Sequence, residues 1–202
     1  LFWVVRFNRI CYTLRKMQLI RGNDMDAVIG IIGTILGTIL GWVLNSLSTR
    51  GKLKIYVSSW NDSFQYNKIG IMTPSKSKEQ TEYYHYDLTL DVYNSSSETK
   101  ILRNIKIEFS DGKNILHTSI PNDEATRRWN GSFASYDSIV PLNVPPKAII
   151  QLKLHDGVWR INSDIGFIWN TQIIYFTYTN EKGKKIKIII KKENYNNYFN
   201  EQ

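Results

Sequence analysis

The segment YHYDLTLDVYNSSSETKILRNIKIEF, residues 84–109, decides the fold of this chain. Apolar and polar side chains alternate strictly from Tyr84 to Val92, which is typical of a β-strand with one face in a core. Asn94 and the three serines after it predict a turn, and the alternation resumes over 103–109. The predicted inward face of the first strand is Tyr84, Tyr86, Leu88, Leu90 and Val92, and the outward face is His85, Asp87, Thr89 and Asp91.

Short alternating stretches continue on both sides of this segment. They predict strands at 52–58, 115–120, 148–154, 172–179 and 185–191. Two stretches lack alternation: 61–80 is predicted to be a long loop or a loose hairpin, and 121–137 an irregular loop. Residues 194–202 are predicted to be a frayed C-terminal tail. About seven or eight short strands with turn signals every ~8–12 residues favour an antiparallel β-sandwich.

Two of these stretches resemble a known layout. LTLDVYNSSSETKILRNIKIEF (88–109) and VPPKAIIQLKL (144–154) are similar to the immunoglobulin-like sandwiches of bacterial surface and membrane proteins. In those proteins a strand ends in Asn and small residues, the next strand returns, and a Pro-containing turn opens a later strand. The resemblance covers roughly residues 86–154 and implies an all-β, immunoglobulin-like antiparallel β-sandwich. It carries no catalytic motif, so it implies no activity.

A second feature is the uncharged run AVIGIIGTILGTILGWVLNSL, residues 27–47, in which eleven of 21 residues are Ile, Leu or Val. As a helix it would be about 31 Å long, which matches the hydrocarbon core of a bilayer. The buried helices of soluble domains are usually shorter and carry a polar stripe. The sequence therefore predicts a single transmembrane α-helix over 25–49, in the cell membrane, followed by the sandwich over 50–193.

Glycines recur every four residues within this run, at Gly33, Gly37 and Gly41, with Thr34 and Thr38 beside them. Small residues at this spacing let two membrane helices approach closely, and threonine hydroxyls can add a bond across the pair. The repeat predicts a homo-oligomer formed through the transmembrane helix. The alternative is that glycine is simply frequent in membrane helices.

Residues 1–24 leave the orientation in the membrane open. They are either a basic N-terminal arm, or partly or wholly untranslated sequence ahead of a start at Met17 or Met25. Arg21-Gly22 can be encoded by a purine run like a ribosome-binding site, which favours Met25. With that start, the basic residues after the helix (Arg50, Lys52 and Lys54) predict a sandwich on the cytoplasmic side; with residues 1–24 translated, the balance favours export.

The charge balance excludes some functions. The net charge is +8, but residues 1–24 contribute +4, from five basic residues and one acidic residue. The remaining 21 basic and 17 acidic residues leave +4 over the rest of the chain, which does not predict nucleic-acid binding. Cys11 is the single cysteine, so neither an internal disulfide nor a cysteine-based metal site is expected.

Two surface features are candidate interaction sites. Arg127, Arg128 and Trp129 lie in the predicted loop 121–137 and could bind an acidic partner or a lipid head group; alternatively, a buried Trp129 pins the loop. Lys185, Lys187 and Lys191 give the last strand a basic face that could lie against anionic lipid. The alternative for that strand is protection of a sheet edge by lysine.

Motifs for chemistry are missing from the sequence. His85, His117 and His155 are far apart, each on a predicted strand, and are expected to face solvent singly rather than share a metal. We expect no catalytic residues, no metal site and no cofactor, because no nucleophile, base and orienting group fall together. The predicted function is non-enzymatic binding or scaffolding of a protein partner at the membrane. The alternatives are a membrane-tethered stress or phage-defence component that acts through assembly of its helix, and a membrane-bound hydrolase or transferase.

Overall fold

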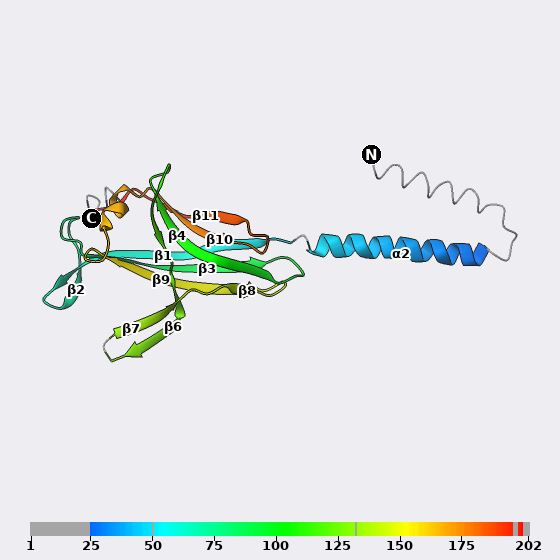
Figure 1. Ribbon diagram of the computed structural model, residues 1–202, viewed down its shortest axis with the longest axis horizontal. Helices are drawn as coiled ribbons and strands as arrows, with labels where there is room; N and C mark the ends of the chain where they lie inside the picture. The colour runs from blue at the N-terminus through cyan, green and yellow to red at the C-terminus, as the bar shows by residue number, and fades with distance from the viewer. Residues whose placement is uncertain (1–24, 50, 132, 196–197, 200–202) are drawn as a thin grey trace. The chain divides into compact units, whose positions relative to one another are not determined.

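The computed structural model describes residues 25–49, 51–131, 133–195 and 198–199. The chain divides into two compact units, Leu1–Thr49 and Arg50–Gln202. The described part of the first unit is one helix and the second is a β-sandwich (Figure 1). The predictions for residues 1–24, including those for Cys11, lie outside the described residues.

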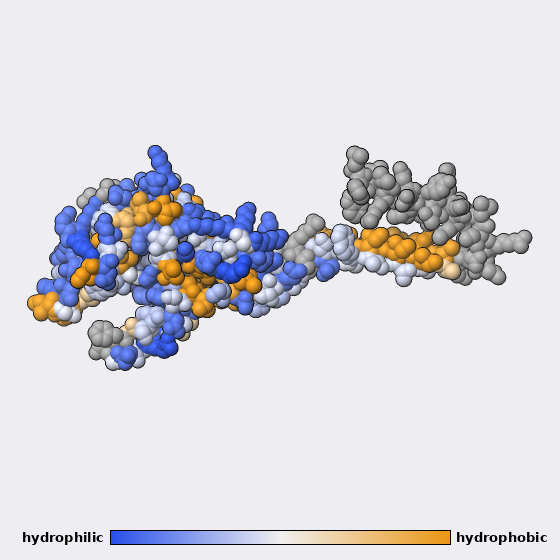
Figure 2. Space-filling view, viewed as in Figure 1, coloured by the Kyte–Doolittle hydropathy of each residue, from blue (hydrophilic) through white to orange (hydrophobic). Residues whose placement is uncertain are grey.

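The helix α2 (Met25–Thr49) contains the predicted apolar run without a break. Over Ala27–Leu47 its mean hydropathy is 2.2 and none of the run is buried, so apolar residues cover its surface (Figure 2). The chain thus carries near its N-terminus one helix long and apolar enough to cross a membrane, a property that membrane spans share with signal sequences. The two threonine hydroxyls donate within the helix, Thr34 to the Gly30 carbonyl (2.7 Å) and Thr38 to the Thr34 carbonyl (2.7 Å).

The sandwich is built from two sheets, in whose described residues neighbouring strands pair antiparallel. The six-stranded sheet has the order β2 (Ile71–Pro74), β1 (Leu53–Lys68), β3 (Tyr83–Asn94), β9 (Ile149–Trp159), β6 (Asn122–Asn130) and β7 (Phe133–Ser138). The five-stranded sheet has the order β11 (Lys185–Lys192), β10 (Ile173–Thr179), β4 (Lys100–Ser110) and β5 (Ile115–Ser119), with β8 (Leu142–Val144) paired to β4. A short 3-10 helix, η1 (Ile165–Asn170), precedes β10.

The core lies between the sheets, and the prediction for β3 is confirmed. All five predicted inward side chains, from Tyr84 to Val92, are buried. They belong to one cluster with side chains of β4 such as Phe109 and of β10 such as Phe176. Complete burial of a large apolar side chain stabilises the fold by about 1.5–3 kcal/mol, so this face of β3 dominates the core.

The two stretches that carry the immunoglobulin-like resemblance meet at Asn94. Its amide is fully buried, and Nδ2 donates to the carbonyls of Glu98 (2.7 Å), Val144 (3.0 Å) and Pro145 (3.0 Å). Its Oδ1 accepts from the Ser96 backbone N–H (2.9 Å). One side chain therefore joins the turn after β3 to the proline turn before β9.

Of the two alternatives for 61–80, the long loop is wrong and the hairpin is confirmed, because β1 continues to Lys68 and pairs with β2. A β-bulge shifts the register between Val57 and Ser59. A bulge adds one residue and so reverses which side chains face inward. Val57 packs against the core before the bulge and Trp60 does so after it, and the alternation therefore looks interrupted in the sequence.

The predicted loop over 121–137 is also wrong, since β6 and β7 form a hairpin. Among the described residues it pairs with the rest of its sheet only through Asn122 and Asp123, opposite His155 and Leu154, and it projects away from the other strands in Figure 1. A hairpin without a core on either face needs no apolar alternation. The missed signal was Asn130-Gly131 at its turn, where Gly131 has a φ of 64°.

The prediction of a frayed tail is wrong for Tyr195, which is fully buried. Its hydroxyl donates to Asp62 of β1, and its ring packs against Phe64, with 5.9 Å between ring centroids. The ring of Tyr198 also packs against Phe64, with 4.6 Å between the ring centroids. Isolated aromatic residues among asparagines have no periodicity, so the sequence pattern gave no sign of this contact.

Candidate binding groove

A groove of about 440 Å³ lies between the outward faces of β3 and β9 and the β6–β7 hairpin. The side chains of the two sheet strands form its floor and those of the hairpin form its wall. The floor includes His85, Asp87, Thr89, Lys153 and His155, and the wall Glu124, Arg127 and Tyr136. Two strands and a hairpin that are far apart in sequence thus contribute polar or charged groups to one surface.

Asp87 is the centre of the floor and contacts two histidines. His155 Nδ1 donates to Asp87 Oδ1 over 2.9 Å, and His85 Nε2 lies 3.6 Å from Asp87 Oδ2. The hydrogen bonds from His155 and then from His85 hold the pKa of Asp87 well below its usual range. The same bond to Asp87 outweighs burial and raises the pKa of His155.

The prediction of three isolated histidines is therefore wrong for two of them. The outward positions of His85 and His155 follow from alternation, but their proximity depends on the pairing of β3 with β9, which places Asp87 opposite His155. Alternation reveals the face of a strand and not its neighbour. His117 lies elsewhere, stacked 4.2 Å from Phe167, and burial lowers its pKa.

The hairpin wall holds a cation between aromatic rings. The Arg127 guanidinium lies 4.7 Å from the ring of Trp129 and 6.0 Å from that of Tyr136, and it pairs with Glu124 over 3.1 Å. The Tyr136 ring is 4.8 Å from that of His155, which connects the wall to the floor. Such cation–π contacts are worth about 0.5–1 kcal/mol each at exposed sites. They are strong enough to orient the Arg127 side chain and too weak to fix the whole hairpin.

The predicted partner-binding residues are thus strand residues rather than loop residues. Trp129 is 67% exposed, which contradicts the alternative of a buried tryptophan that pins a loop. Arg128 forms an ion pair with Asp137 across the hairpin. Because Arg127 and Arg128 each have a carboxylate partner within the hairpin, the wall is not a bare basic patch.

The three lysines of the predicted basic strand also have acidic partners. Lys185 and Lys187 bind the carboxylate of Glu108, over 2.5 and 2.9 Å, and Lys191 pairs with Asp62 (3.5 Å). Burial alone would raise the pKa of Glu108, but the bonds to the two lysines lower it. The strand β11 lies at the edge of the five-stranded sheet, where lysines hinder pairing with other chains.

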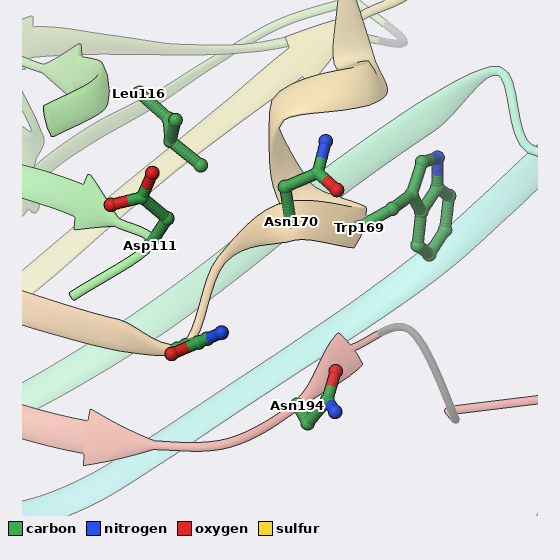
Figure 3. A pocket seen from close by; sticks show the side chains of 6 residues that line it. Asp111, Leu116, Trp169, Asn170 and Asn194 are labelled. Atoms are coloured by element: carbon green, nitrogen blue, oxygen red, sulfur yellow. The ribbon is translucent and has the colours of Figure 1, made fainter. Parts of the chain in front are cut away.

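A second depression, of about 380 Å³, has one charged side chain, that of Asp111, among its lining residues. It is lined by residues of the β4–β5 turn, of β5, of η1 and of the segments just before β10 and just after β11 (Figure 3). These residues are Asp111, Leu116, Trp169, Asn170, Gln172 and Asn194. The Asp111 carboxylate accepts from the backbone N–H groups of Lys113 (2.7 Å) and Asn114 (2.6 Å), so it serves its own turn. The groove on the other sheet is therefore the better candidate.

One arrangement in the floor resembles part of a catalytic relay. Ser63 Oγ is 2.8 Å from His85 Nδ1, and His85 in turn approaches Asp87. However, Ser63 lies opposite His85 in the β1–β3 ladder, on a flat sheet whose backbone amides bond to neighbouring strands, and acyl transfer needs free amides for the oxyanion. The described residues also contain no group of three His, Cys, Asp or Glu that could hold a metal ion. This geometry favours recognition through charge and hydrogen bonds.

The chain is similar to a curated relative and, at low TM-scores, to solved structures. A curated relative, the SPbeta prophage-derived uncharacterized protein YopI of Bacillus subtilis (strain 168), is 29% identical over 128 residues, which are 62% of this chain and 72% of the relative. An uncharacterized β-sandwich protein of Clostridium difficile 630 is 15% identical over 69% of this chain and 86% of its own, with a TM-score of 0.31. A structural-genomics target is 18% identical over 69% of this chain and 82% of its own, with a TM-score of 0.32.

The match to a family model decides to which family the chain belongs. The model of the YopI Ig-like domain matches residues 51–191, which is nearly the whole sandwich. It confirms the predicted immunoglobulin-like fold. This chain belongs to the family of YopI Ig-like domains.

Proposed function

We propose that this chain is a single-pass membrane protein whose Ig-like domain binds a segment of a partner protein in the groove beside the β6–β7 hairpin. The observation that supports this proposal is the groove itself, where Arg127, Tyr136 and Lys153 line one surface. Arginine and tyrosine beside a groove are the residue types that contribute most to protein interfaces. The module acts by binding, without a catalytic step or a cofactor.

The membrane part of the proposal depends on α2. Its 21-residue apolar run is unburied and long enough to span a bilayer. The basic residues Arg50, Lys52 and Lys54 directly follow the helix, and such residues favour the cytoplasmic side. We therefore propose that the sandwich lies in the cytoplasm. A reporter at the C-terminus that is active only in the cytoplasm tests this side, and activity of an export-dependent reporter would contradict it.

Site-specific photocrosslinking in intact cells tests the groove. A photoreactive residue at Lys153, on the floor, should yield a discrete crosslinked band, and Arg127→Ala should remove that band. A photoreactive residue at Lys182, in the β10–β11 turn away from the groove, is the matched control. The same band from both positions, or one that persists in Arg127→Ala, would contradict binding in the groove.

A second candidate function has its own support. The relative's name places it in a prophage, and the glycine repeat of α2 allows close helix contact. We accordingly propose as the alternative a membrane-tethered stress or phage-defence component that acts through assembly of α2. Since the hydroxyls of Thr34 and Thr38 already donate within the helix, assembly would depend on packing at Gly33, Gly37 and Gly41.

A bilayer association assay separates this alternative from the groove. Gly37→Ile should abolish self-association without impairing insertion, because the larger side chain holds the backbones apart. Leu40→Ile, off the repeat, should associate like the parent. Unchanged association of Gly37→Ile would remove the alternative and leave binding in the groove unaffected.

A further inference from the structure

The β1–β2 hairpin ends in an exposed apolar tip, formed by Ile69, Ile71 and Met72. Their exposed fractions are 95%, 69% and 36%. Figure 2 shows apolar residues at this end of the sandwich, at the β2 hairpin labelled in Figure 1. Single exposed aliphatic side chains are common on proteins, but three within four residues at a convex tip need an explanation.

The backbone conformation at the tip disfavours the residue that occupies it. Ile69 has a φ of 55° and Gly70 a φ of 82°, and Asn67 Oδ1 accepts from the Gly70 N–H over 2.7 Å to close the turn. Asparagine or glycine is the usual residue at the first of two such positions, whereas a β-branched residue there is strained. Folding alone would favour Asn at position 69, so the isoleucine side chain serves something outside the fold.

Basic residues outnumber acidic ones around the tip. Residues 67–82 contain three lysines (Lys68, Lys76 and Lys78) and two glutamates, Glu79 and Glu82. The loop after β9 lies at the same end, because Glu82 accepts from the Arg160 N–H through its carbonyl (2.8 Å) and from the Asn67 N–H through its carboxylate (2.9 Å). That loop adds Ile161, which is 89% exposed. Aliphatic side chains flanked by lysines match the chemistry of a bilayer surface that contains anionic lipid.

We propose that the apolar tip inserts into the interfacial layer of a bilayer that contains anionic lipid. A narrow convex hairpin has no groove in which a protein partner could seat a side chain, whereas acyl chains adapt to a protruding tip. The three aliphatic side chains enter the layer, and the lysines bind head-group phosphates. This inference goes beyond the proposed function, and it does not depend on which side of the membrane the sandwich occupies.

Fluorescence in proteoliposomes tests the insertion. The full chain, with Cys11→Ser, carries an environment-sensitive dye at Ile71→Cys and is reconstituted in vesicles of phosphatidylcholine and phosphatidylglycerol. We expect a blue-shifted dye that brominated lipids quench. The same dye at Lys113→Cys, in the exposed polar turn after β4, should show neither effect. A dye at Leu36→Cys, within α2, reports insertion of the helix separately.

Ile69→Asn is the decisive variant, because the left-handed conformation suits Asn better than Ile. It should reduce the shift and the quenching at position 71, while the urea midpoint of the sandwich stays the same or rises. Vesicles of phosphatidylcholine alone should also reduce both signals. A dye at position 71 that behaves like the one at 113, while the dye at 36 is quenched, would overturn insertion of the tip and leave the anchor intact. Quenching at 71 without quenching at 36 would support the tip and overturn the anchor.

Discussion

At the scale of the residue, the sandwich depends on buried polar side chains that find partners from distant segments. Asn94 joins two turns, Asp62 joins β1 to the C-terminal segment, and Glu108 joins β4 to β11. A buried polar group without a partner costs about 1–3 kcal/mol, so each of these contacts fixes one arrangement of the strands against alternatives. Polar residues therefore specify how these strands are arranged, while apolar residues supply most of the driving force.

Replacement of Asn94 by Ala should destabilise the sandwich strongly. The change removes the side-chain donor that three carbonyls share in a buried turn, and we expect a loss of about 3 kcal/mol in the free energy of unfolding. Urea unfolding followed by tryptophan fluorescence measures it. Asn143→Ala, at an exposed position of β8, is the matched control and should change the free energy by less than about 0.5 kcal/mol. Similar losses in both variants would refute the role of the Asn94 amide.

The Asp87–His155 pair should make stability depend on pH in a defined direction. His155 has a raised pKa when folded, so its contribution is complete below its usual value near 6.5 and disappears as the pH rises through the folded pKa. Asp87 has a lowered pKa, so its contribution is present above its usual value near 3.8 and is lost on further acidification. Between these values both contributions hold.

A comparison of the parent with His155→Gln isolates this effect. Burial lowers the pKa of His117, which changes stability with pH in the opposite direction, but this contribution is present in both proteins and cancels in the difference. The difference in unfolding free energy should be largest between about pH 4 and 6.5 and should shrink above that range. Urea unfolding at a series of pH values measures it. If the difference in unfolding free energy stayed constant with pH, the bond to Asp87 would not change the pKa of His155 on folding.

At the scale of the element, alternation identified β3 and its inward face, and it also identified β4, β5, β10 and β11. It failed where a bulge shifted the alternation after Val57 and where the β6–β7 hairpin has no core to face. The groove could be predicted only in part. The outward faces of its floor follow from alternation, but the pairing of Asp87 with His155 is a contact across 68 residues that no local pattern encodes.

The inward face of β3 makes a testable prediction about two adjacent residues. Leu88→Asp introduces a carboxylate into the core and should cost several kcal/mol, about 3–5, which unfolds a domain of ordinary stability. Thr89→Asp introduces the same carboxylate on the outward face, opposite Lys153, and should be tolerated. Circular dichroism and urea unfolding distinguish the two. Equal effects would mean that the register of β3 differs from the one described.

At the scale of the whole molecule, the end of the chain closes the sandwich. Tyr195 packs against Phe64 and Tyr84 and bonds to Asp62, so the last described residues contact the strand that begins the domain. Desolvation raises the pKa of Tyr195 far above its usual value, which fits a neutral hydroxyl that donates to a carboxylate. The domain therefore needs the segment after β11 for its core.

Tyr195→Ala should destabilise the sandwich by about 3–5 kcal/mol, since it removes a buried aromatic ring and one of the donors to the Asp62 carboxylate. Tyr195→Phe should cost less, because the ring remains. Tyr56→Ala, at an exposed position of β1, is the control and should have little effect. Thermal and urea unfolding of the full chain measure all three. Equal stability of Tyr195→Ala and Tyr56→Ala would contradict a closing role for the C-terminal segment.

The pairing of β1 with β3 has a mechanical consequence for a tethered domain. The chain enters the sandwich at Leu53, directly after the helix unit, and β1 is joined to β3 through twelve residue pairs, from Leu53–Asn94 to Gln65–Tyr83. In the proposed function, a partner held in the groove would pull on β3 and β9, while the anchor would pull on the start of β1. Tension along these strands loads the ladder in shear, so the pairs share the force instead of breaking one after another. If the proposed function holds, the strand that follows the helix would make the domain a strong link between a bilayer and the bound partner.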